Sequence, residues 1–195
     1  MVKKDLNSWN RWLHIYLSMF SFATLFFFAV TGITLNHPRW IESHQRVEMI
    51  KGDINPAWVS GNDTSSVAKL EIVEYLRDKY KIKARLTDFM IDVNDCSVSF
   101  NGPGYTADGF ISRQTGSYIL TVTTAGYIAV LNDLHKGRDT GSKWAVIIDI
   151  SAILMVLVSL TGFVMIFFIT RRKSKGLWVA AFGTVTLLIL YLLFV

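Results

Sequence analysis

Three long stretches of the chain contain no charged side chain: Ile15–Leu35, Ile150–Thr170 and Leu177–Val195. At a helical rise of about 1.5 Å per residue, stretches of this length cover the roughly 30 Å hydrocarbon core of a bilayer. Backbone groups inside lipid must hydrogen-bond within their own segment, which favours helices over other forms. The hydrophobic pattern therefore predicts three transmembrane helices.

The pattern changes between the first two stretches. Apolar residues recur at helical spacing and predict a helix over about 66–80, capped within residues 63–65 and with Val67, Leu70, Val73, Leu76 and Tyr80 on its apolar face. Alternating apolar residues then predict strands near 89–93, 96–100, 109–111 and 117–122, separated by turn residues. The predicted fold class is a membrane α-helical protein with an inserted small α+β domain, a helix plus an antiparallel meander.

Composition and charge add an orientation. Hydrophobic residues make up 51% of the chain and the mean hydropathy is +0.36, as expected for a membrane protein. Basic residues precede the first stretch (Lys3, Lys4, Arg11) and fill the connection 171–176, so both segments are expected in the cytoplasm and the inserted domain outside it. The net charge of +5 then reflects membrane orientation and gives no support for nucleic-acid binding. The first stretch is long for a signal peptide and ends without an Ala-type cleavage site, which favours an uncleaved anchor over a cleaved signal.

Several chemistries find no support in the sequence. Cys96 is the only cysteine, which excludes an intramolecular disulfide, and it is expected to pack as a small buried hydrophobe. No glycine-rich strand-to-helix turn indicates a dinucleotide or flavin site. No nucleophile, base and orienting acid can be assembled for hydrolysis.

Histidines are the main candidates for chemistry. His37 ends the first apolar stretch and His135 leads into the second, so the topology brings both to the same face of the membrane. Two imidazoles from different helices can hold a low-spin haem iron, and His37 with His135 is the preferred axial pair. His44 is an alternative to His37, which is preferred because Pro38 fixes where the helix stops. Interfacial histidines that only cap helix ends or bind lipid headgroups are the competing interpretation.

Charged residues near this pair can complete a haem site. Arg39, Lys136 and Arg138 lie on the same side and can meet the two propionates. Asp149 is the one carboxylate at membrane depth and can accept the second ring N–H of a ligand histidine, although an interfacial acid near Lys143 is an equal alternative. Small residues, among them the pairs Thr31-Gly32 and Thr161-Gly162, mark where helices approach closely and leave room for a porphyrin or for a neighbouring helix.

His14 needs a separate interpretation. It precedes His37 by 23 residues on one predicted helix, about 35 Å at helical rise, so the two cannot share an iron. His14 is a candidate ligand of a second haem, with Met165 or the His14 of a second copy in a homodimer as its partner. The alternative is an interfacial histidine beside Arg11 and Trp12.

Four segments resemble the PepSY-associated transmembrane family: residues 11–14, 31–37, 134–137 and 160–163, the last shortly before Arg171-Arg172. The resemblance implies a multi-pass protein of the bacterial inner membrane with a periplasmic PepSY-like domain. It also implies haem b and the haem-dependent reduction of ferric siderophores during iron uptake. With this family the expected segments are a cytoplasmic N-terminus (1–14), transmembrane helices (15–37, 144–170, 177–195), a periplasmic domain (38–143) and a cytoplasmic loop (171–176).

Together with the histidine positions, the resemblance implies electron transfer through haem b to a periplasmic ferric chelate. Electrons must then cross the bilayer, and a second haem at His14, a membrane quinol or a partner protein is needed to supply them. The alternative is a non-enzymatic accessory protein whose anchored domain binds a partner at an open sheet edge.

Overall fold

The computed structural model describes residues 2–42, 45–60, 66–169 and 171–195. The chain divides into two compact units, Met1–Phe27 with Asp149–Val195, and Phe28–Ile148.

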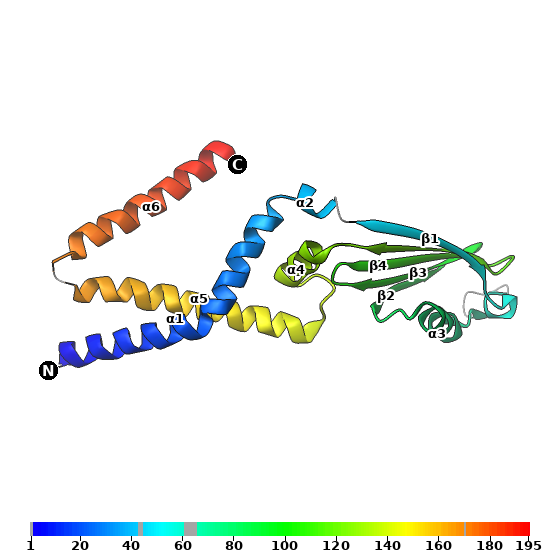
Figure 1. The fold of residues 1–195 in the computed structure, drawn as a ribbon, viewed down its shortest axis with the longest axis horizontal. Coiled ribbons are helices and arrows are strands. Elements are labelled where there is room, and N and C mark those ends of the chain that lie inside the picture. Colours follow the sequence, from blue (N-terminus) through cyan, green and yellow to red (C-terminus); the bar gives the residue numbers. More distant parts are fainter. Residues whose placement is uncertain (1, 43–44, 61–65, 170) are drawn as a thin grey trace. The chain divides into compact units, whose positions relative to one another are not determined.

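The first unit is built from apolar helices (Figure 1). They are the larger part of α1 (Val2–Leu35), most of α5 (Ser142–Met165) followed by a 3₁₀ turn (Ile166–Phe168), and α6 (Lys173–Phe194). Spans long and apolar enough to cross a bilayer cover Asp5–Leu35, Ser142–Phe168 and Lys173–Phe194. At most 6% of each span is buried inside the protein, which leaves the apolar surfaces to lipid. The prediction of three membrane helices is confirmed.

The second unit contains an antiparallel five-stranded sheet with the order β1-β5-β4-β3-β2 (Figure 1). Its strands are β1 (Arg46–Asp53), β2 (Arg85–Ile91), β3 (Asp95–Gly102), β4 (Tyr105–Ser112) and β5 (Ser117–Thr124). Its helices are the short α2 (Arg39–Glu42), a 3₁₀ turn (Pro56–Trp58), α3 (Lys69–Tyr80) and α4 (Tyr127–Lys136). The predicted α+β domain between the first two membrane helices is therefore confirmed.

The strand alternation behaves as the sequence indicates. On β3, Cys96, Val98 and Phe100 are at most 1% exposed and form the core together with α3, while the intervening serines face the other side of the sheet. Cys96 is a buried packing residue, as expected.

Strand β1 is absent from the strands predicted from the sequence pattern. Val47 and Met49 are more than half exposed, so the strand lacks a strong apolar alternation. The segment becomes a strand through its pairing with β5, in which Ile50 lies opposite Leu120. This pairing joins two segments that are separated by the rest of the domain, and strand propensity does not report it.

Helix α3 differs from its prediction. It begins at Lys69 and not near Ser66, and Leu70 is 68% exposed, whereas Ile72, Val73 and Leu76 are buried. Ile72, and not Leu70, therefore packs into the core of the domain together with Val73 and Leu76. The capping residues predicted at 63–65 lie outside the described residues.

Helix α4 is separate from the membrane helix that follows it. Gly137 ends α4 in the left-handed conformation (φ +71°), which glycine adopts without steric cost. The chain turns and begins α5 at Ser142, and the Trp144 indole N–H donates to Leu134 O (2.8 Å). This turn fixes the place of α4 beside the start of α5.

Candidate cofactor site

His135 lies in the second unit, where α4 meets the end of α1. Its Nδ1 is 2.6 Å from Thr31 Oγ1, and its ring packs edge-on against Phe28 with centroids 4.9 Å apart. A Cβ added at Gly32 would lie 4.0 Å from His135 Cε1, so the glycine leaves room beside the ring. We call His135, Asn132, Thr31, Gly32 and Thr34 the His135 clamp.

Asn132 is the second side chain by which α4 contacts α1. It is 3% exposed, and its Oδ1 accepts a hydrogen bond from Thr34 Oγ1 (2.5 Å). Its Nδ2 is buried without a hydrogen-bond partner in the described part of the chain. Exchanging the amide O and N would leave the other amide atom unpaired instead, so the clamp contains one unsatisfied polar atom under either assignment.

The protonation of His135 suits metal binding. Burial lowers the pKa of His135, and the neighbouring charge of Lys136 lowers it further. The ring is therefore neutral around neutral pH, and neutral imidazole is the form that ligates metals. With Nδ1 on Thr31, Nε2 is the nitrogen that remains for a metal.

A similar arrangement occurs in the first unit, around His14. His14 Nδ1 is 2.9 Å from Thr161 Oγ1, and Asn10, one turn earlier on α1, donates from Nδ2 to Thr161 O (3.1 Å). A Cβ added at Gly162 would lie only 3.1 Å from His14 Cε1. Asn10 and Thr161 are buried. We call Asn10, His14, Thr161 and Gly162 the His14 clamp.

His37 has different neighbours from His135. Its ring is exposed, stacks on Trp40 (centroids 4.4 Å apart) and has Nδ1 2.9 Å from Ile33 O. His135 instead contacts Phe28 and Thr31, which lie within α1. The two histidine rings therefore share none of these contact residues. The pairing of His37 with His135 stays a prediction, and the alternative ligand His44 lies outside the described residues.

The predicted charged residues are mostly exposed. Arg39, Lys136 and Arg138 have exposed side chains, and Arg138 forms a 2.7 Å ion pair with the buried Asp133. Asp149 is exposed in the first unit, and Nδ1 of each described histidine bonds to a threonine or a carbonyl and not to Asp149.

Asp133 anchors α4 to the sheet. Its Oδ2 accepts from the Gly104 N–H (2.8 Å), at the turn between β3 and β4. Asp133 and Ala129, one turn earlier, line a cavity of about 520 Å³ with Arg138, Asp139 and residues at the end of the sheet, among them Asn101, Thr106 and Thr123. Helix α4 thus presents His135 on one face and borders a polar cavity with another.

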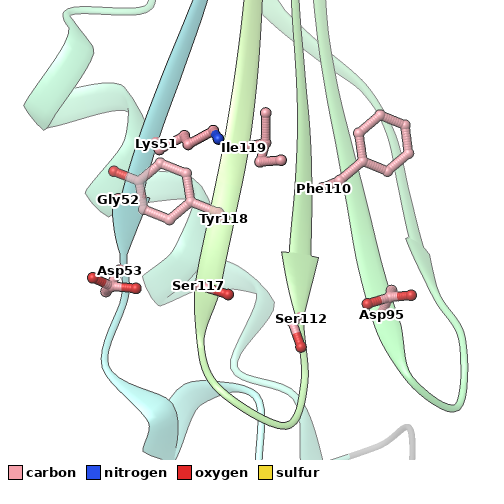
Figure 2. A pocket seen from close by; sticks show the side chains of 9 residues that line it. All are labelled: Lys51, Gly52, Asp53, Asp95, Phe110, Ser112, Ser117, Tyr118 and Ile119. Atoms are coloured by element: carbon pink, nitrogen blue, oxygen red, sulfur yellow. The ribbon is translucent and has the colours of Figure 1, made fainter.

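A second hollow, of about 580 Å³, lies over the sheet (Figure 2). Ile119 and Phe110 are paired neighbours on β5 and β4 and are 43% and 61% exposed. Asp53, Asp95, Ser112 and Ser117 form its polar end, near the turn that joins β4 and β5. Its lining contains none of the histidines considered above.

Sequence reasoning missed the partners of the histidines. Thr31 and Thr161 were noted only as members of small-residue pairs, and Asn10 and Asn132 were not considered. The available signal was an asparagine three or four residues before a histidine, combined with a Thr-Gly pair on another helix. Only the fold shows that these two patterns meet.

Membrane-crossing helices with an α+β domain inserted between the first and second define a multi-pass membrane protein. The chain belongs to the putative PepSY_TM-like family (PepSY_TM_like_2), whose profile matches residues 8–195, and the resemblance found in the sequence is confirmed. No curated protein and no solved structure matches the chain.

Proposed function

We propose that the protein is a haem b-binding electron-transfer protein of the bacterial inner membrane that reduces a ferric chelate, such as a siderophore, for iron uptake. Its N-terminus and the 171–176 loop face the cytoplasm, and the α+β domain faces the periplasm. The observation that carries the proposal is His135: a neutral imidazole with Nδ1 engaged, on a helix that also borders a polar cavity.

The residues of the His135 clamp are compatible with a haem. One imidazole nitrogen is available, the unpaired amide atom of Asn132 can bond to a bound group, and Gly32 and Phe28 offer a small and a flat apolar contact. His37, or His44, is the candidate for the second axial position. Arg39, Lys136 and the outer part of Arg138 are candidates for the propionates.

A bound haem supplies one-electron chemistry, because its iron alternates between the ferric and ferrous states. The chain's own residues keep His135 neutral, fix its ring against Thr31 and hold α4 to the sheet through Asp133. The cavity beside Asp133 and Arg138 offers hydrogen-bonding groups to a polar chelate. Reduction weakens the hold of hard oxygen ligands on the metal, which releases it.

Electrons reach the outer haem through a second haem at His14 or directly, and a membrane quinol or a partner protein supplies them. The His14 clamp supports the route through a second haem, because it repeats the Thr-Gly and histidine arrangement in the other unit. Met165 lies one turn after Thr161 on α5 and is half-buried, while a homodimer offers another His14.

Reduced-minus-oxidised absorption spectra of membranes test the proposal. With haem in ample supply, the wild type is expected to show b-type bands, and His135→Ala is expected to lose those of the outer haem. His37→Ala and His44→Ala identify the second ligand, and His14→Ala removes only a second haem. Colourless wild-type protein contradicts the proposal. Ferrous-iron trapping with spheroplasts then measures chelate reduction at the periplasmic face.

An accessory role without haem is the second candidate. The outer strands β1 and β2 leave two sheet edges, and Phe110 and Ile119 are exposed on the sheet. An extended segment of a partner can pair with such an edge. This role predicts colourless protein, and it predicts a partner that crosslinks to β1 in cells and is lost when Val47 is changed to proline.

A further inference from the structure

The two histidine clamps, one in each unit, share the same local chemistry. In each, a helix carrying an asparagine and a histidine contacts a Thr-Gly pair of another helix, with the histidine Nδ1 on the threonine Oγ1. The two threonines are 9% exposed or less, so water does not compete freely for these bonds. The repetition indicates that the threonine has a defined role toward the ring.

The hydrogen bonds of Thr161 determine which atom carries the proton. Thr161 Oγ1 lies 2.8 Å from Leu157 O and 3.0 Å from Val158 O, and backbone carbonyls can only accept. A hydroxyl has a single proton, which is directed to these carbonyls. The contact with His14 must then run from Nδ1–H to the threonine oxygen. Nε2 is left with its lone pair.

Thr31 repeats this pattern with different distances. Its Oγ1 is 3.4 Å from Phe28 O and 2.6 Å from His135 Nδ1. The Phe28 carbonyl can only accept, so a hydroxyl proton directed to it leaves Thr31 Oγ1 to accept from His135 Nδ1–H. This is the tautomer argued for His14.

We propose that Thr161 and Thr31 are positioning residues that hold His14 and His135 as Nδ1–H tautomers, so that Nε2 of each ring is the metal-binding nitrogen. In solution neutral imidazole favours the other tautomer, with the proton on Nε2, where it blocks coordination. The identity of the metal as haem iron rests on the proposed function. The tautomers themselves depend only on the hydrogen bonds of the chain.

His37 provides an internal reference. Its Nδ1 faces the Ile33 carbonyl, an obligate acceptor, at 2.9 Å. The Nδ1–H tautomer is therefore fixed there without a threonine. Thr184 provides a matched control, because its hydroxyl donates to Ala180 O at 3.0 Å as Thr161 does to Leu157 O, but it contacts no described histidine.

Nitrogen NMR of histidine-labelled, haem-free full-length protein in detergent tests the inference. The pH is held well above the ordinary histidine pKa of about 6.5, and each of the four histidines is assigned by its own substitution. In the wild type, His14 and His135 are expected as Nδ1–H tautomers. Thr161→Val moves only His14 toward Nε2–H, Thr31→Val moves only His135, and the serine variants restore the wild-type signals. Thr184→Val changes neither.

The inference is overturned if His14 and His135 carry the proton on Nε2 in the wild type, or if the valine variants leave both signals unchanged. A variant that fails to fold is recognised by circular dichroism and by gel filtration of the protein in detergent. The corresponding serine variant then decides, because it keeps the hydroxyl in a smaller side chain.

Haem titration separates this inference from the proposed function. Loss of a bond that orients a ligand typically weakens metal affinity by roughly 10–100-fold, so Thr31→Val is expected to weaken haem binding in that range and Thr31→Ser to retain it. Wild-type protein that binds no haem removes the proposed function but leaves the NMR result to decide the tautomers. Haem bound equally by wild type and both valine variants, with unchanged NMR signals, removes the inference and keeps the function.

Discussion

Replacing Asp133 by alanine tests how α4 is held to the sheet. Asp133 is 5% exposed and accepts the Gly104 N–H at 2.8 Å and Arg138 at 2.7 Å. A hydrogen bond to a charged group contributes about 1.5–3 kcal/mol. The Arg138 side chain is 64% exposed. Solvent screening therefore limits its ion pair to about 0–1 kcal/mol.

The local cost of Asp133→Ala is therefore about 2–3 kcal/mol, dominated by the Gly104 N–H left without its acceptor. At about 1.4 kcal/mol per factor of ten, this corresponds to roughly 30- to 140-fold faster opening. Hydrogen exchange of the full-length protein in detergent measures it, with the acceleration expected in peptides covering α4 and the β3–β4 turn. Asp133→Asn keeps an acceptor and should accelerate exchange far less.

Asp78→Ala is the matched control, because Asp78 pairs with Lys81 at 2.9 Å while both side chains are at least 79% exposed. It should change exchange by about twofold or less. If Asp133→Ala and Arg138→Ala accelerate exchange equally, the ion pair and not the Gly104 bond holds α4, and the reasoning is refuted. If Asp133→Ala has no effect, α4 is held by other contacts.

Three further predictions concern single side chains. Gly162→Ala brings a Cβ to 3.1 Å from His14 Cε1 and should perturb the His14 signal in NMR. Gly32→Ala brings a Cβ to 4.0 Å from His135 Cε1, an ordinary contact, and should leave the His135 signal unchanged. Equal effects of the two substitutions would contradict the geometry. Leu76 is fully buried and Leu70 is 68% exposed, so Leu76→Ala should lower the free energy of unfolding of the domain by about 2–5 kcal/mol and Leu70→Ala by about 0.5 kcal/mol or less. Chemical denaturation measures both, and the reverse order would mean that Leu70 lies on the buried face, as the sequence pattern predicts. Burial and the Tyr80 hydroxyl raise the pKa of Tyr118. The stability that its neutral hydroxyl contributes is complete below the unfolded pKa of about 10 and is lost as the pH rises through the folded pKa. Tyr118→Phe should therefore flatten the alkaline decline in stability measured by denaturation, and an unchanged decline would count against this assignment.

Much of the fold is predictable because local patterns determine it. The uncharged stretches can only be helices in lipid, and Cys96, Val98 and Phe100 alternate as a half-buried strand must. The β1 strand and the face of α3 are different cases. Met49 and Val47 are exposed, so only pairing with β5 makes the segment a strand. On α3, packing into the core decides that Ile72 and not Leu70 is buried.

The candidate site divides in the same way. The sequence by itself determined that histidines lie at the ends of apolar spans, that Thr-Gly pairs occur in two of those spans, and that no cysteine or glycine-rich motif offers another chemistry. Only the tertiary structure decided which partner each histidine has: Thr161 for His14, Thr31 for His135 and the Ile33 carbonyl for His37. The reason is physical, because hydrophobicity sets the depth of a residue in a membrane, whereas a hydrogen bond depends on distances and angles that only packed helices define.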